Sequence, residues 1–443
     1  MANKDFTEQI YDFITEEEDG RICEAIPDEA CKEVPRNFLL NALNGSATKI
    51  AEQIVSPELV LPWFLSALGA PAFLTGLLVP IRRGGSMLPQ LAIAGHIRQY
   101  KKRKWFWVAA GTTQALMLFL MLLSGFLLPP KTTGWLVVLL LVIFSVASGV
   151  GSVAFKDVLA KTIPKGRRGR LLAVRATIGG ILSLAAGVLI RFYVSGTNSI
   201  NLYLILIGTA ALLWLMGTLF FMAIDETNGA TGGGRSALQE AKAGISLLRD
   251  NRGFAKFIAA RSLLLSVKLS IPFFAIYARQ QVGDVMGNLG IFIIAVAISK
   301  IISSPFWGKF ADKSSRRVMM SAGIFAALVS LVTLVVSFST DMIQNVYVYA
   351  ILFMLIGLAQ SGIRLGRKTY LVDGAPEKER PLYVALSNTI IGIILIMSMV
   401  LGVIADIYGV KMLLAIFVVL ETAGVWVAYT MPEAEKLVFR KVY

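Results

Sequence analysis

Apolar stretches of about 20 residues recur along nearly the whole chain, and short polar loops separate them. A helix of that length crosses the ~30 Å hydrocarbon core of a bilayer, because an α-helix rises ~1.5 Å per residue. Only 16% of the 443 residues are charged, whereas soluble domains carry about 25%. The pattern excludes a soluble globular domain and predicts a polytopic α-helical membrane protein.

We predict twelve spans, and they divide the chain into five parts. The spans lie near residues 37–60, 66–97, 105–128, 134–158, 170–193, 201–224, 256–278, 285–308, 317–339, 345–370, 382–406 and 411–431. The parts are an acidic N-terminal segment (1–35), a first six-helix bundle (36–224), a linker (225–255), a second six-helix bundle (256–431) and a tail (432–443). The N-terminal segment holds Cys23 and Cys31, which we expect to be reduced thiols in the cytoplasm.

Basic residues gather in alternate loops, and such loops face the cytoplasm. These loops contain Arg98, Lys101, Lys102, Arg103, Lys104, Lys161, Lys165, Arg167, Arg168, Arg170, Arg235, Lys242, Arg249, Arg252, Lys309, Lys313, Arg316, Arg317, Lys378 and Arg380. The opposite loops contain only Lys131, Arg279 and Lys411. We therefore expect both termini in the cytoplasm and the chain in the cell (inner) membrane. The net charge of +15 follows from these loops, so no nucleic-acid partner is expected.

The two halves of the sequence resemble each other at an offset of about 212 residues. Pro164, which precedes the fifth span, is matched by Pro376 before the eleventh. Gly95 at the end of the second span is matched by Gly308 at the end of the eighth. With an even number of spans in each half, the two repeats run parallel and are related by an axis along the membrane normal.

Residues 308–317 read Gly-Lys-Phe-Ala-Asp-Lys-Ser-Ser-Arg-Arg, and this run resembles the signature loop of the major facilitator superfamily. The resemblance implies an all-α membrane protein with twelve transmembrane helices in two pseudo-symmetric six-helix bundles, of bacterial type. It also implies a cytoplasmic gate that includes Gly95, Gly308, Asp312, Arg316 and Arg317. In the first-half copy of the loop, Gln99 stands where the family has Asp.

Several ionisable residues fall inside predicted spans, where each charge costs about 2.5–3.5 kcal/mol. We expect substrate-binding residues among Lys49, Glu52, Arg82, Arg83, Lys268 and Lys300. In the family's architecture these residues face or reach a central cavity. Because cations dominate the set, the expected substrate is a small organic anion, such as a carboxylate or a phosphorylated metabolite. Glu52 is the candidate for proton coupling, which makes protons a further expected partner.

A purely structural interpretation of these charges stays open. Lys49 and Glu52 are three residues apart and can neutralise each other. Arg83 can pair with Glu52 or with a backbone carbonyl, and Lys300 can bridge helices or reach toward the membrane surface. Glu421, in the last span, would lie on an outer helix and is expected to be structural or at the lipid interface.

The leading functional hypothesis is a secondary active transporter that works by alternating access as a monomer. One alternative is a drug or toxic-metabolite efflux antiporter, although Thr177-Ile-Gly179-Gly180 lacks the Gly-Pro of that subgroup. Another alternative is a non-transporting sensor or assembly partner with residues 1–30 as a docking arm. The Gly-rich run at 229–236 follows a membrane span instead of a β-strand, so we interpret it as a linker and not a nucleotide site. No catalytic or metal-ligand pattern is found, so we expect no enzyme, cofactor or metal.

Overall fold

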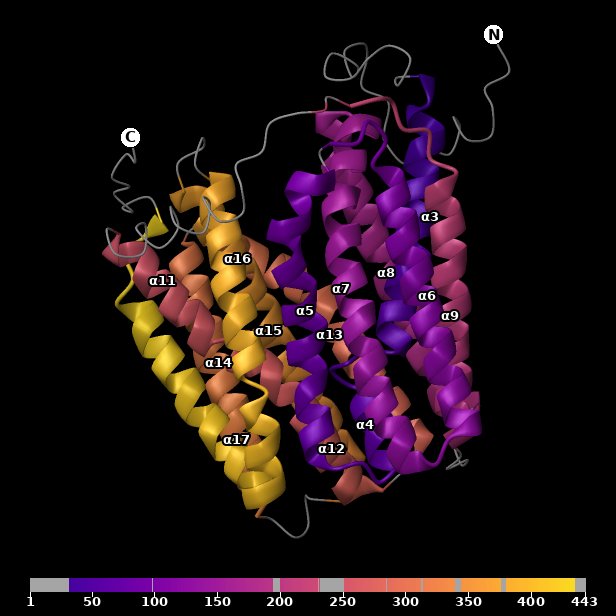
Figure 1. Cartoon of the computed structure of the whole chain (residues 1–443). Coiled ribbons are helices and arrows are strands. Elements are labelled where there is room, and N and C mark those ends of the chain that lie inside the picture. The colour runs from indigo at the N-terminus through magenta and orange to yellow at the C-terminus, as the bar shows by residue number, and fades with distance from the viewer. Residues whose placement is uncertain are drawn as a thin grey trace.

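The computed structural model describes residues 32–97, 99–193, 200–229, 231, 251–283, 285–311, 314–338, 344–375 and 380–434. Within these ranges the chain is almost entirely helical and contains no strand. The helices lie side by side, and both ends of the described chain lie at the same end of the bundle (Figure 1). We call this the terminal end, and the opposite end the distal end.

Fourteen helices are described, and they follow one another with short connections. They are α3 (Val34–Ile54), α4 (Val60–Ala67), α5 (Ala72–Ile97), α6 (Lys104–Leu127), α7 (Pro130–Thr162), α8 (Lys165–Tyr193), α9 (Ile200–Met222), α11 (Arg252–Leu263), α12 (Ser266–Val282), α13 (Met286–Ala311), α14 (Ser315–Val336), α15 (Val346–Gly374), α16 (Arg380–Met397) and α17 (Val400–Tyr429).

The predicted spans differ from these helices mainly at breaks. The first described helix, α3, ends at Ile54 instead of 60, and a separate helix α4 occupies the predicted connection to the second span. Between them, Pro57 lacks a backbone N–H and disfavours helix at the residue before it. The second predicted span begins at Ala72 instead of 66, after Gly69 adopts a φ of 68°. In α17, Gly409 has a φ of 81° and separates two helical segments, at the boundary between the predicted spans 382–406 and 411–431. Such a φ suits glycine because it has no Cβ.

Of the described helices, nine are long and apolar enough to cross a membrane. Neither α3 nor α5 is among the nine. In α5, Arg82 and Arg83 lie near the middle of the helix. The total of twelve spans stays a prediction. Residues 232–250 of the linker and both cysteines lie outside the described residues.

The helices pack mostly within each half of the chain, and two seams join the halves. In one seam α5 packs on α12, α16 and α17, and in the other α8 packs on α13. Glycines allow the backbones to approach closely at these seams. A Cβ on Gly76 of α5 would lie 2.5 Å from Cα of Gly402 in α17. A Cβ on Gly290 of α13 would lie 2.7 Å from the backbone nitrogen of Arg191 in α8.

Polar contacts tie the halves together at the distal end. The guanidinium of Arg279, near the end of α12, donates a hydrogen bond to the hydroxyl of Ser66 in α4. The backbone N–H of Phe73, in the first turn of α5, donates to Asp406 of α17 at 3.0 Å. Closer to the terminal end, Lys49 has a side chain that is 54% exposed although it lies within α3 and pairs with an interior carboxylate. The hydrogen bonds of Arg279 and Phe73, which join the two halves, therefore lie at the distal end.

Glu421 of α17 is fully buried within the second half, so a position at the lipid interface is wrong. The hydroxyl of Ser330 in α14 lies close to this carboxylate, but by strict hydrogen-bond geometry neither carboxylate oxygen nor that hydroxyl has a partner among the described residues. An unpartnered buried polar group costs about 1–3 kcal/mol. Glu421→Met should therefore raise the melting temperature of the detergent-purified protein by several degrees.

The matched control is Glu226→Gln, because Glu226 is also buried but accepts hydrogen bonds from the backbone N–H groups of Arg103 and Lys104 and from Lys161. This substitution should lower the melting temperature. A lower melting temperature for Glu421→Met as well would show that the Glu421 carboxyl makes stabilising contacts, contrary to the prediction.

Candidate functional site

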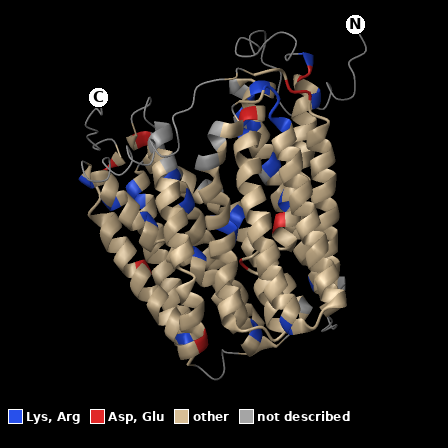
Figure 2. Ribbon diagram, viewed as in Figure 1, with Lys and Arg blue, Asp and Glu red and all other residues tan. Residues whose placement is uncertain are grey.

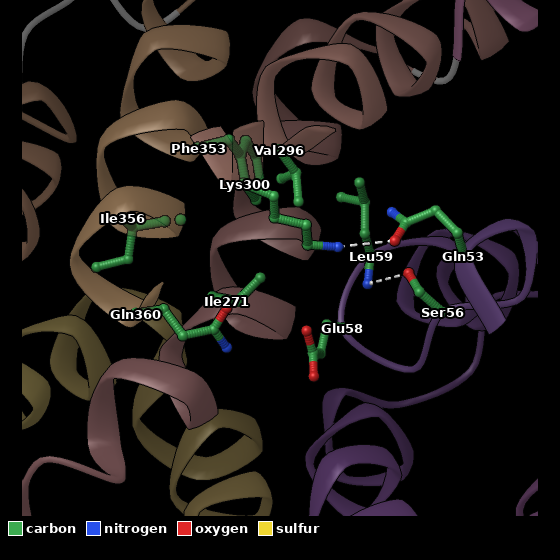
Figure 3. Close-up of a pocket in the computed structure, with 11 residues that line it drawn as sticks. Gln53, Ser56, Glu58, Leu59, Ile271, Val296, Lys300, Phe353, Ile356 and Gln360 are labelled. Atoms are coloured by element: carbon green, nitrogen blue, oxygen red, sulfur yellow. Dashed lines mark hydrogen bonds between the residues drawn. The ribbon is translucent and has the colours of Figure 1, made fainter. Parts of the chain in front are cut away.

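The break between α3 and α4 places a carboxylate inside the bundle. The hydroxyl of Ser56 accepts hydrogen bonds from the backbone N–H groups of Leu59 and Val60, at 3.2 and 3.3 Å, and so caps the start of α4. Glu58 lies between these residues, on the short connection of residues 55–59. Its side chain is 20% exposed and points toward the second half of the protein (Figure 3).

Two carboxylates are each held by two cations. Glu52 accepts from Lys49 at 2.8 Å and from Arg82 at 2.6 Å. Glu58 accepts from Lys268 at 2.8 Å and from Arg83 at 3.2 Å. Consecutive residues of a helix point about 100° apart, which is why the adjacent arginines of α5 reach different carboxylates.

Two of the polar contacts cross between the halves at this level. The pair of Glu58 with Lys268 joins the α3–α4 connection to α12. In addition, the ammonium of Lys300 in α13 donates to the side-chain oxygen of Gln53 in α3 at 2.8 Å (Figure 3). We call Glu52, Glu58 and their cationic partners the central ion-pair layer.

Next to this layer lies a small pocket between the two halves. It is lined by Gln53, Ser56, Glu58, Leu59, Ile271, Val296, Lys300, Phe353, Ile356, Gly357 and Gln360. The cavity measures about 30 Å³, which holds about one water molecule. An organic solute does not fit in a cavity of this size.

Further cations lie toward the terminal end of the bundle and have no carboxylate partner among the described residues. Arg175 of α8 donates to the backbone oxygen of Asn41 and to the side-chain oxygen of Asn44. Arg261 of α11 donates to the side chains of Ser387 and Asn388 in α16. The remaining members of this set lie on α15: Arg364, Arg367 and Lys368. Lysines and arginines mark several helices well inside the bundle, mainly toward its terminal end (Figure 2).

The structure brings the six predicted site residues to this region, with pairings that only partly match the structural interpretation. Lys49 does pair with Glu52, and Lys300 does bridge two helices. Arg83 pairs with Glu58, so the suggested pairing with Glu52 or a backbone carbonyl is wrong. Sequence reasoning missed Glu58 altogether; the signal was Pro57 beside a carboxylate within an apolar stretch.

The second-half gate loop is anchored to its own half. The hydroxyl of Ser314 caps α14 and donates to Glu433, and the guanidinium of Arg316 pairs with Glu433 at 2.7 Å. Partial burial opposes ionisation of this carboxyl, but the hydrogen bonds from Ser314 and Arg316 and the charge of Arg316 prevail and lower the pKa of Glu433. The backbone N–H of Arg317 donates to Ser314. Asp312 lies outside the described residues.

The other two predicted gate residues are Gly95 and Gly308. In the first-half loop, carboxylates from other segments of the chain contact the loop in place of the expected Asp. A Cβ on Gly308 would meet nothing within 4 Å, and Gly95 lies in the last turn of α5. Where Gln99 replaces the expected Asp, the loop is held by two carboxylates: Glu226, as described above, and Asp157 of α7, which pairs with Arg103 at 2.8 Å. The carboxylate expected from the loop itself is thus supplied by Asp157 of α7 and by Glu226 in the segment that follows α9.

Comparison with known proteins agrees with this architecture. Residues 257–441 match the family model of the Major Facilitator Superfamily. Curated relatives include uncharacterised proteins of Mycobacterium tuberculosis (Rv2209) and Mycobacterium bovis (Mb2232), each 22% identical over 248 residues that make up 55% of this chain and 48% of theirs. The chain therefore spans about half the length of the curated relatives it matches.

Solved structures resemble the fold over most of the chain. The nucleoside transporter NupG shares 12% identity at a TM-score of 0.64, covering 89% of this chain and 98% of its own. A D-xylose-proton symporter shares 14% identity at a TM-score of 0.63, covering 92% and 98%. At this identity the likeness shows the fold alone. The second half of the chain thus resembles the Major Facilitator Superfamily in sequence, and the fold over most of the chain resembles that of NupG and the D-xylose-proton symporter.

Proposed function

We propose that the protein is a secondary active transporter in which two six-helix bundles rock about a central site to give alternating access. The terminal end is then the cytoplasmic side of the cell membrane, and the protein works as a monomer. The two seams of close backbone contact and the polar contacts between the halves at the distal end support this assignment, because they fit a state that is closed at the distal end.

The proposed substrate is a small organic anion. The single observation that carries this proposal is the sharing of Glu58 by Arg83 and Lys268, which join the two halves around one carboxylate. An anionic substrate would offer these cations a second carboxylate and so compete with Glu58. Binding would thereby be coupled to the contact between the halves, which is the contact that has to change during rocking.

Proton coupling is proposed at Glu52. This carboxylate is held by Lys49 and Arg82, so it takes up a proton only when a pair opens. Movement of α5 relative to α3 would separate Arg82 from Glu52 and allow that step. The coupling thus links a change in helix position to a change in charge.

The first test is thermal unfolding of the purified protein with a library of anionic, cationic and neutral metabolites. A ligand at 100 times its dissociation constant stabilises by about 2.7 kcal/mol, so anions should raise the melting temperature. Lys268→Ala should abolish the shift, whereas the control Lys411→Ala, at an exposed position of α17, should keep it. Shifts confined to lipophilic cations would contradict the anion proposal and favour the efflux alternative.

A further inference from the structure

We propose that Arg364, Arg367 and Lys368 of α15, together with Arg261 of α11, form the binding site for the phosphate group of a phosphorylated substrate. The inference rests on the proposed transport of an organic anion and names the chemical class of that anion. The site is distinct from the central ion-pair layer, where each carboxylate already holds two cations.

The three α15 cations project from one face of the helix. Positions three and four residues apart are neighbours on a helix surface, so Arg364 adjoins both Arg367 and Lys368. Arg364 and Lys368 are exposed, and Arg367 is half-buried. Arg364 is close enough to Arg83 and Glu58 for their charges to interact, which places this face toward the interior space between the halves. Within the part of the chain that the structure describes, none of the three makes an ion pair.

Arg261 supplies a second, independent observation. Its side chain is only 7% exposed, and its Nε has no hydrogen-bond partner among the described residues. It interacts electrostatically with Arg367 on the neighbouring helix. A buried guanidinium with an unused donor, next to another guanidinium, is costly unless an anion lies between them.

Charge and geometry favour a phosphate over a single carboxylate. A phosphate monoester carries about −1.5 to −2 charges at pH 7 and has three strong acceptor oxygens. Paired arginines match such a group because each guanidinium can donate two parallel hydrogen bonds. A monocarboxylate has one charge and two oxygens, so most of the donors on α15 and α11 would stay unused.

The depth of the cluster fits the available space. Arg364 lies ten residues from Gly374 at the end of α15, which corresponds to roughly 15 Å along the helix. The small pocket beside Glu58 and Gln360 is about one turn deeper and holds only about 30 Å³. A phosphate at the α15 cluster would therefore lie outside this pocket, against the exposed side chains of Arg364 and Lys368, and the rest of the substrate would extend toward Lys268 and Arg83.

The test measures binding of glycerol 3-phosphate to the purified full-length protein by titration of the melting temperature, with acetate and chloride at matched ionic strength as comparisons. Glycerol 3-phosphate should stabilise saturably and more strongly than either. The double substitution Arg367→Gln, Lys368→Gln should weaken its apparent affinity at least about tenfold. Lys411→Gln, which removes a distal cation beside Phe338, should leave it unchanged.

The remaining outcomes each decide the inference. Equal affinity in the double variant, or no preference over chloride, would overturn it. Binding of acetate without binding of the phosphate ester would overturn it as well, yet would leave the proposed anion transport standing if Lys268→Ala abolished that binding. No binding of any anion would overturn both.

Discussion

Replacing Glu58 with glutamine should tighten anion binding about tenfold, or about 1.4 kcal/mol, while nearly abolishing transport. Glu58 neutralises Arg83 and Lys268 in the substrate-free protein. Glutamine has a similar shape but no charge, so both cations become available to the substrate. Without this ion pair between its halves, the substrate-free protein would reorient its binding site only slowly from one side of the membrane to the other. Titration of the melting temperature gives the affinity, and anion uptake into proteoliposomes gives the rate.

The matched control is Glu421→Gln, a change of the same chemistry at a buried carboxylate far from the cations of the ion-pair layer. It should leave anion affinity unchanged. The charge exchange Glu58→Lys with Lys268→Glu restores an opposite-charge pair across the halves and should recover part of the transport that Lys268→Glu alone abolishes. Weaker anion binding by Glu58→Gln would contradict competition between Glu58 and the substrate.

Most helices of this fold were predictable because hydrocarbon leaves the backbone no partner outside the helix. An apolar stretch between charged loops must therefore be helical, and α6, α7 and α9 lie close to the predicted spans. The breaks were harder to predict. Pro57 was the only local signal for the interruption after α3, and the separation of α11 from α12 at 264–265 has no proline or glycine at the break. Packing against neighbouring helices decides such positions.

The candidate site was predictable in its residue types and only partly in its pairs. Buried cations inside spans stand out because they are costly there. Glu58 did not stand out, because the prediction placed it near the end of a continuous span of residues 37–60. A charge so close to the membrane surface costs little free energy. The break in the helix moves it inside the bundle, beside Lys268 of α12. Contacts between distant helices leave no periodic trace in the sequence, which is why this partner was missed.

The second large effect is expected from Gly402→Val at the seam of α5 and α17. A Cβ at Gly402 would lie 2.8 Å from the carbonyl oxygen of Phe73 and 3.1 Å from Cα of Gly76. Both are backbone atoms, so the helices must move apart instead of a side chain rotating away. Overpacking of this kind costs about 1–3 kcal/mol, which shifts a two-state equilibrium by about 5- to 150-fold. We expect the distal end to open and transport to fall accordingly.

The measurement is labelling by a membrane-impermeant maleimide in a protein with Cys23→Ser and Cys31→Ser. Val79→Cys reports the distal seam, because Val79 is 1% exposed and packs in a cluster with Phe273 and Ile391 of the second half. Lys49→Cys reports the terminal end. In the Gly402→Val background, labelling at 79 should rise several-fold and labelling at 49 should fall, since alternating access opens one end as it closes the other.

Gly180→Val is the matched control, because a Cβ on Gly180 would meet nothing within 4 Å and its backbone needs no positive φ. It should change neither labelling rate. A rise at both positions in Gly402→Val would indicate general loosening of the bundle instead of a shift between two states. Unchanged labelling at both positions would contradict the idea that the contact between Gly76 and Gly402 holds the distal end closed. Only opposite changes at the two ends connect this glycine pair to rocking of the two halves.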